Sequence, residues 1–223
     1  MTESKKILNK TRAHTRYELA DGTKVPGVTT MTGQLAKHGL VPWANKLGLE
    51  GIDVRKFVDE LGTIGTLAHY IVECQLKDIE PDLGDFTPNQ SEMAQKCVNK
   101  FDEWLKENKF KVIETELQLV SEEYFFGGTC DIYCELNGKK TLIDLKTSKA
   151  VYDEQFTQVS AYKFLLEANG HPVEDVRIVR IGRNELEGFE DKKVENLKLH
   201  WAKFRHLLEL YKIDKVIKNG GKK

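Results

Sequence analysis

The feature that most constrains this chain is a hairpin signal, Asn137-Gly138, inside the stretch GGTCDIYCELNGKKTLIDLKTSK (residues 127–149). Both turn residues tolerate the positive φ angles of a type I′ turn, the favoured two-residue connection between antiparallel strands. A two-residue loop fixes the register of the strands on either side of it. Continued away from the turn, this register predicts that Asp131 faces Asp144 directly across the two strands.

Facing carboxylates on one side of a sheet repel each other. At a separation of about 5 Å and an effective dielectric constant of about 20, the unscreened repulsion is about 3 kcal/mol. A divalent cation between Asp131 and Asp144 would turn repulsion into attraction, and Mg²⁺ favours one or two carboxylates combined with water and phosphate oxygens. The pair therefore indicates either a metal site or a structural charge cluster.

Lys146 follows Asp144 by two residues, so the two side chains share a face of the strand. Beside a metal ion, an ammonium group can position or deprotonate a water molecule, or stabilise charge in a transition state. The alternative is a structural triad in which Lys146 neutralises both Asp131 and Asp144, since buried charges are usually paired. The hairpin by itself leaves both interpretations open.

Composition narrows the class of protein. The chain has 223 residues, of which 40% are hydrophobic and 31% are charged, as expected for one globular core. It has no apolar run of membrane-spanning length and no signal-peptide core, so we expect a cytoplasmic protein of a bacterial or phage-infected cell with no membrane partner. A net charge of −1 argues against a simple electrostatic nucleic-acid binder, but not against a metal-dependent enzyme with a local basic surface.

The order of expected elements predicts an α/β or α+β fold in which a central mixed β-sheet is flanked by helices. The apolar periodicity and the turn signals place these elements at a small hairpin within 14–30, helices at 54–77 and 88–108, strands at 111–120, 124–136 and 139–147, a helix at 153–168, a strand at 175–183 and a closing helix through residue 211. There is no internal repeat or interdomain linker, so we expect a single domain.

Two helices carry polar pairs at a spacing of four residues, which places each pair on one helix face. Gln158 and Tyr162 follow the Asp-Leu-Lys strand closely, with Gln155 one turn earlier. His69 and Glu73 lie at the edge of an apolar stripe in the first long helix. A lone histidine at such an edge is usually a boundary residue, and His69 gains weight only because a metal site is already suspected.

These pieces together resemble the PD-(D/E)XK nucleases, and in particular their RecB-like exonuclease branch, which includes phage-type exonucleases and the mitochondrial genome-maintenance exonuclease. The resemblance covers about residues 25–165. Its motifs occur in the family's order: Gly65 with His69, Gly128 with Asp131, Asp144 with Lys146, and Gln158 with Tyr162. The segment VPGVTT is similar to the entry motif of the family, with Gly27 where serine is usual.

The resemblance implies a restriction-endonuclease-like core and a Mg²⁺- or Mn²⁺-dependent DNA nuclease. The metal would be held by Asp131, Asp144, the Leu145 carbonyl and His69. Lys146 would activate the water, and Gln158 and Tyr162 would support the site and the DNA backbone. Some relatives carry an iron–sulfur cluster held by late cysteines; no cysteine follows Cys134 here, so we expect none.

The single nuclease domain, residues 1–223, is expected to divide into three parts. Residues 1–50 form an N-terminal hairpin and a DNA-contacting extension, residues 54–212 form the nuclease core, and residues 213–223 form a basic tail. DNA-contacting candidates in the extension are Thr29, Thr30 and Trp43. A base could stack on Trp43, although packing of this side chain into the core is the stronger interpretation.

Several further candidates carry two readings each. Thr147 and Ser148 could contact phosphate or could cap the next helix. Glu116 could be an additional metal ligand or outer partner, although an exposed strand carboxylate is favoured. Glu73 and Gln155 are candidates for residues that surround the metal ligands without binding the metal themselves. The four cysteines, Cys74, Cys97, Cys130 and Cys134, lack metal-binding spacing and are expected to be reduced and mostly buried.

The sequence therefore predicts a metal-dependent DNA exonuclease that acts in recombination, repair or phage replication on linear single- or double-stranded DNA. A structure-specific or restriction-like endonuclease and a catalytically silent DNA-binding protein of the same fold are the alternatives. By analogy with phage exonucleases, a single-strand annealing protein or further copies of this chain are candidate partners.

Overall fold

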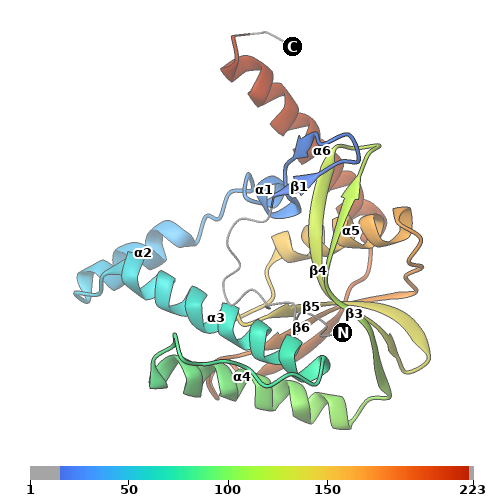
Figure 1. Cartoon of the computed structure of the whole chain (residues 1–223). Coiled ribbons are helices and arrows are strands. Elements are labelled where there is room, and N and C mark those ends of the chain that lie inside the picture. The colour runs from blue at the N-terminus through green and yellow to red at the C-terminus, as the bar shows by residue number, and fades with distance from the viewer. Residues whose placement is uncertain (1–15, 221–223) are drawn as a thin grey trace.

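The computed structural model describes residues 16–220 and contains a five-stranded mixed sheet in the order β3-β4-β5-β6-β7, together with a separate two-stranded sheet, β1-β2 (Figure 1). The elements in chain order are β1 (Tyr17–Glu18), β2 (Lys24–Val25), α1 (Val28–Thr32), α2 (Leu40–Leu49), α3 (Val54–Leu76), α4 (Pro88–Lys106), β3 (Phe110–Ser121), β4 (Phe126–Leu136), β5 (Lys139–Lys146), α5 (Asp153–Ala168), β6 (Asp175–Ile181), β7 (Phe189–Lys193) and α6 (Leu197–Lys218). The predicted α/β class, a mixed sheet flanked by helices, is confirmed.

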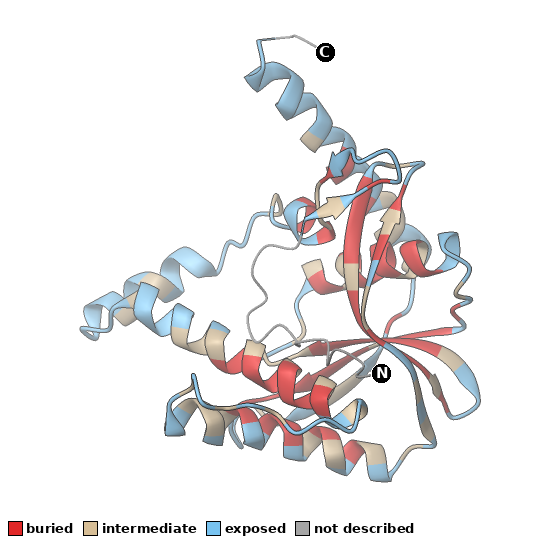
Figure 2. Ribbon diagram, viewed as in Figure 1, coloured by how far each residue is buried: buried red, intermediate tan, exposed pale blue. Residues whose placement is uncertain are grey.

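Helices cover both faces of the sheet, because strand residues alternate between two apolar clusters. Tyr133 and Leu142 pack in one cluster, with residues of α1, α5 and α6. Ile132 and Ile143 pack in the other, with residues of α3 and α4. Figure 2 shows the buried residues gathered around the sheet, whereas α2 and the ends of α3 and α6 that project from the body are exposed.

Helices α3 and α4, which pack on the same face of the sheet, begin where their capping residues predict. Asp53 accepts hydrogen bonds from the backbone N–H groups of Arg55 and Lys56 at the start of α3. Thr87 and Gln90 form a capping box at the start of α4, with Pro88 in the first helical position. No helix in residues 16–220 is long and apolar enough to cross a membrane.

The predicted hairpin register is confirmed for five successive pairs, from Leu136 with Lys139 to Ile132 with Ile143. The ladder between β4 and β5 then stops one position short of the aspartates, so Asp131 and Asp144 are not the cross-strand pair that the register predicts. Beyond this point β4 stays paired with β3, and Figure 1 shows the β3–β4 arm running toward β1 and α6. The two aspartates therefore lie at a fork in the sheet.

One local prediction is wrong, and one strand was not predicted. Trp43, which we expected in the core, lies on α2 with 37% of its surface exposed, and its ring contacts Phe57 at a centroid distance of 6.3 Å. Helix α2 has no buried residues at all. Strand β7 was not predicted, because its sequence FEDKK has no apolar alternation and only its main chain pairs with β6.

The glycine before the fork allows α5 to lie directly on β4. An ideal Cβ built at Gly128 would lie 2.8 Å from Cε1 of Tyr162 and 2.9 Å from Cδ1 of Leu165. A ring and a core leucine cannot move aside freely, because protein interiors are close-packed. Gly128 therefore sets the distance between the fork and the helix that carries Tyr162.

We predict that Gly128→Ala lowers the free energy of unfolding by about 1–3 kcal/mol, the usual cost of overpacking a core. Urea denaturation measures this change. Gly62→Ala in α3 is the control: its Cβ meets no heavy atom within 4 Å, and alanine in a helix is favoured over glycine by up to about 1 kcal/mol. Equal unfolding free energies for the two variants would contradict the close approach.

Candidate metal centre

Asp131 is the residue around which the site is organised. It is buried, and its Oδ2 accepts a hydrogen bond of 2.8 Å from the backbone N–H of Leu145. In a continued ladder that N–H would point toward the β4 main chain, so the carboxylate takes the place of a ladder acceptor. Because the strands separate here, the carboxylate sits between them, where His69 of α3 also approaches it.

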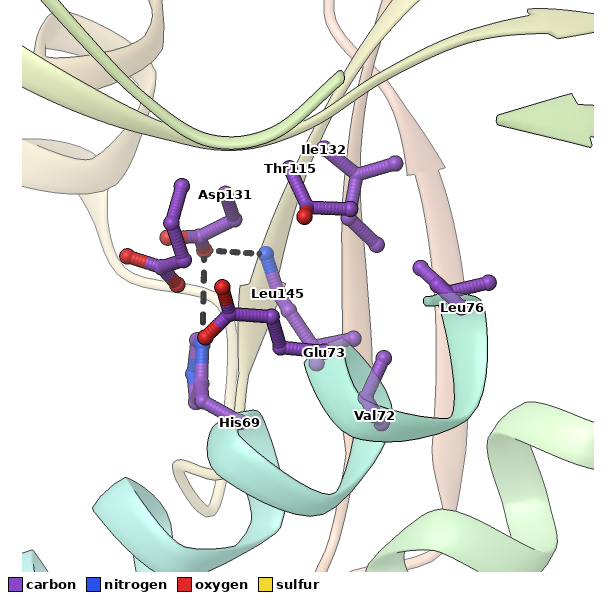
Figure 3. A pocket seen from close by; sticks show the side chains of 9 residues that line it. His69, Val72, Glu73, Leu76, Thr115, Asp131, Ile132 and Leu145 are labelled. Atoms are coloured by element: carbon purple, nitrogen blue, oxygen red, sulfur yellow. Dashed lines mark hydrogen bonds and ion pairs between the residues drawn. The ribbon is translucent and has the colours of Figure 1, made fainter. Parts of the chain in front are cut away.

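On the α3 side, Nδ1 of His69 lies 3.7 Å from Oδ2 of Asp131. His69, Glu116 and Asp131 each offer one ligand atom, and these atoms all lie within 4.8 Å of one another. All three residues line one small cavity, and Figure 3 shows His69 and Glu73 projecting from α3 toward Asp131. A histidine with two carboxylates is a donor set that could hold a divalent cation.

Glu116 reaches the cluster from an unusual backbone conformation. Its φ is 49°, in the left-handed region, which non-glycine residues seldom adopt and which costs of the order of 1–3 kcal/mol. The flanking pairs Thr115–Ile132 and Leu117–Cys130 place Glu116 opposite Asp131 on β3. The interpretation of Glu116 as an exposed strand carboxylate is thus wrong: the residue is half-buried and belongs to the cluster.

On the α5 side, Asp144 is only 1% exposed, and its Oδ2 lies 2.6 Å from Nζ of Lys146. This ion pair offsets part of the cost of burying the carboxylate. Alternation along β5 places both residues on the face opposite Ile143 and Leu145, which pack toward α3 and α4. Asp144 is not a member of the His69–Glu116–Asp131 group.

The polar pair on α5 also faces the aspartates. Nε2 of Gln158 donates a hydrogen bond of 2.9 Å to the hydroxyl oxygen of Tyr162. Burial, followed by the negative charges of Asp144 and Asp131, raises the pKa of Tyr162 well above its ordinary value. A neutral phenol is therefore held beside the two carboxylates, with Gln158 fixing its orientation.

Glu73 and Gln155, the candidates for residues around the metal ligands, contact residues outside the proposed site. Glu73 lines the cavity, but its carboxylate pairs with Lys77 at 2.5 Å. Gln155 organises the start of α5: its Oε1 accepts from the Tyr152 N–H at 3.0 Å, and its Nε2 lies 3.5 Å from Oγ of Ser148.

The residues just past Lys146 shape the connection to α5. The Ser148 hydroxyl donates to the carbonyl oxygen of Ala150 at 2.7 Å, so this side chain stabilises the loop before the helix. Thr147 lies against α3, where its Oγ1 would be 2.6 Å from a Cβ at Gly65. Gly65 thus allows α3 to approach the end of β5 closely.

The candidates in the N-terminal extension lie outside the cluster. Thr29 and Thr30 are exposed on α1, and Trp43 is exposed on α2. The VPGVTT segment is anchored through Pro26, whose carbonyl oxygen accepts from the Gly127 N–H at 2.9 Å. This contact joins the segment to the first residues of β4, so it supports the arm of the fork and leaves the threonines facing outward.

In comparisons with protein-family models and with curated protein sequences, nothing matches this chain.

We predict that Asp131→Ala is less stable than Asp131→Asn by about 1–3 kcal/mol, the cost of leaving a buried N–H unsatisfied. Asparagine keeps a side-chain oxygen for the Leu145 N–H, and both substitutions remove the same charge, so their difference isolates the hydrogen bond. Urea unfolding of the two metal-free variants measures it. Equal stabilities would mean that this hydrogen bond does not hold the fork.

The four cysteines are free and buried. Burial raises the pKa of Cys97 to about 11 and that of Cys134 to about 12. Burial first, and then the charges of Asp131, Asp144 and Glu116, raises the pKa of Cys130 well above its ordinary value.

Because the thiolate is the reactive form, we predict that the native protein resists alkylation by iodoacetamide at pH 8, a pH below all of these values. Mass spectrometry should find little modification of the native chain and four modifications after denaturation in guanidinium chloride. Rapid alkylation of Cys130 in the native protein would show that the base of the fork opens to solvent.

Proposed function

We propose that the protein is a metal-dependent deoxyribonuclease that hydrolyses phosphodiester bonds, and that it acts as an exonuclease. One observation carries the proposal: buried Asp144 and half-buried Lys146 form an ion pair on one strand, beside the fork that holds Asp131. At this fork Asp131 accepts the Leu145 N–H, which holds its carboxylate in place.

The residues at the fork fit a divalent cation. The buried carboxylate of Asp131 lies in one group with His69 and Glu116, and carboxylate oxygens are ligands that a divalent cation prefers. Asp131, Asp144 and the Leu145 carbonyl would hold Mg²⁺ or Mn²⁺ on the side of Lys146. When bound, the ion supplies a water of lowered pKa and offsets charge on the phosphate.

The side chains of this face have separate tasks in the proposed reaction. Lys146 orients the attacking water and stabilises the negative charge that develops as the water loses its proton to solvent, and Asp144 holds the ammonium group at 2.6 Å for that task. The water attacks phosphorus in line as the bond to the 3′ oxygen breaks, which leaves a 5′-phosphate. Tyr162 stays protonated because its pKa is raised, so its hydroxyl, oriented by Gln158, can hydrogen-bond a phosphate oxygen.

DNA as the substrate, and action from an end, rest on the resemblance to the RecB-like branch of the PD-(D/E)XK nucleases. Two observations support this assignment. The glycines of its motifs, Gly65 and Gly128, stand where Thr147 and Tyr162 approach too closely for a Cβ. The histidine and the first aspartate of the motifs, His69 and Asp131, lie 3.7 Å apart although 62 positions separate them in the chain (131 − 69).

We predict that Asp144→Ala and Lys146→Ala each lower the rate of DNA cleavage by at least about 100-fold, the usual effect of losing a group that stabilises transition-state charge. End-labelled linear DNA, single- and double-stranded, and a covalently closed circle are incubated with Mg²⁺ or with EDTA. Loss of linear DNA alone, abolished by EDTA and by both substitutions, is the expected result.

Lys139→Ala is the matched control, because this lysine lies at the exposed start of the same strand. It should cleave DNA at the wild-type rate. Cutting of the closed circle would replace the exonuclease with an endonuclease. Binding of DNA without any metal-dependent cutting would mean that the fold serves as a DNA-binding protein and that the Asp144–Lys146 pair is structural.

A further inference from the structure

We infer that two copies of the protein associate through α6, with the α6 helix of one copy packed antiparallel against that of the other. The contact surface is a row of residues along the outer side of the helix, which we call the outer stripe: Leu199, Lys203, His206, Leu210, Ile213 and Ile217. The inference is independent of the proposed function, because no residue of the outer stripe belongs to the fork.

Helix α6 carries apolar side chains on two faces. Its inner face packs into the core, where Phe204 and Leu208 are almost fully buried. On the outer stripe, by contrast, the apolar side chains lie in solvent, with these exposed fractions: Leu199 71%, Leu210 47%, Ile213 55% and Ile217 68%. A surface helix normally has one apolar stripe and a polar opposite face. A second apolar stripe is therefore explained by a second packing partner.

The spacing of the outer stripe indicates that this partner is a helix. Its six residues follow one another at alternating intervals of four and three positions, from Leu199 to Ile217. This is the spacing of a coiled-coil seam, which keeps one face of a helix against another helix. The outer stripe runs along nearly all of α6, which has 22 residues and is about 33 Å long.

The last part of α6 lacks support from its own chain. After Leu208 the helix has no buried residue. Figure 1 shows this end projecting from the body, and Figure 2 shows that it is exposed. Isolated helices shorter than about 12–15 residues are marginal in water. A second helix packed along Leu210, Ile213 and Ile217 would stabilise this end.

The charges along the outer stripe favour a second copy in the antiparallel orientation. Lys203 lies in the first half of the stripe, and Asp214 borders its second half. In a parallel pair, Lys203 would face Lys203 of the other copy, and like charges repel. In an antiparallel pair centred on residue 208, Lys203 faces Ile213 and lies beside Asp214 of the other copy. The two-fold symmetry of such a pair forms this opposite-charge contact twice.

The same charges disfavour the other surfaces that an apolar helix face could meet. Glu209 and Asp214 border the apolar half of the outer stripe, one on each side, and both are exposed. Nucleic acid and anionic lipid present negative charge to a protein. Acidic residues at both borders would repel them, whereas a second copy brings Lys203 to this place.

Sedimentation equilibrium of the full-length protein tests the inference. The contact between two single helices is small, so we expect a weak dimer, with twice the chain mass of 25.5 kDa and a Kd of the order of 10 µM. Ile217→Glu should weaken the dimer by at least about 10-fold, because each copy then places an unpaired carboxylate against Leu199 of the other.

Val41→Glu is the matched control, because Val41 is a 77% exposed apolar residue on another helix, α2. This variant should dimerise as wild type does. Val41 and Ile217 both lie in solvent, so both variants should unfold at the same urea concentration as wild-type monomer. That result shows that a lost dimer is not a lost fold.

Cross-linking tests the orientation of the two helices. In the antiparallel pair Leu199 faces Ile217 of the other copy, whereas the two copies of Ile217 lie about 27 Å apart along the helix axis. A short bis-maleimide should therefore link two chains that each carry Leu199→Cys and Ile217→Cys. Neither substitution alone should give a linked dimer. The four native cysteines are buried and do not compete for the reagent.

Three results would each overturn the inference. The first is a protein that stays monomeric at about 100 µM, ten times the expected Kd. The second is a dimer that Ile217→Glu leaves unchanged or that Val41→Glu abolishes, which would place the contact elsewhere. The third is a linked dimer from Ile217→Cys alone, which would mean a parallel pair.

Vesicles that contain phosphatidylserine distinguish the remaining occupant. A monomer that sediments with these vesicles, and no longer does so as Ile217→Glu, would assign the outer stripe to a lipid surface and reject the dimer. None of these measurements involves DNA cleavage. A dimer that cleaves no DNA would thus reject the proposed function alone, and a monomeric nuclease would reject the dimer alone.

Discussion

The hydrogen bond from the Leu145 N–H to the Asp131 carboxylate is the contact on which the site depends. It replaces a main-chain ladder bond at the place where β4 leaves β5 and continues with β3 alone. Since a buried N–H must find an acceptor, the strands can separate there without leaving one unsatisfied. Two sets of polar groups lie at this fork: His69 and Glu116 with Asp131, and Lys146 with Asp144.

The site contains groups that destabilise the fold: buried carboxylates and one residue with a strained backbone conformation. Asp131 and Asp144 are buried carboxylates, and Glu116 adds a third acidic group from a left-handed backbone position. Buried acidic groups and strained residues persist only where the surrounding structure holds them. Here two apolar clusters on either face of the sheet do so, and close contacts at Gly65 and Gly128 bring α3 and α5 against the fork. Such a cluster is understandable if a cation binds there.

Much of this arrangement could be predicted from short-range patterns. The Asn137-Gly138 turn predicted the register of β4 and β5, and helix α5 begins and ends where its pattern indicated, at Asp153 and Ala168.

The sequence-based predictions failed where a residue departs from the conformation or burial that its type favours. Glu116 has no sequence signal for a positive φ, since glutamate is not a residue that favours this region. Trp43 is apolar and aromatic, so burial was the natural expectation, yet α2 packs too little to bury it. Strand β7 is polar and is a strand only because β6 offers a free edge.

The sequence by itself determined the elements that hold the site, because turn chemistry, capping and apolar periodicity act between residues close together in the chain. It also indicated Asp131, Asp144 and Lys146 as a group, since the register and a spacing of two residues place them near one another. Only the tertiary structure decided that Asp144 pairs with Lys146 while Asp131 groups with His69 and Glu116. Where the ladder ends depends on Asp131 accepting from Leu145, and whether Glu116 joins His69 depends on how β3 and α3 pack. These contacts bring together residues far apart in the chain, and no local pattern specifies them.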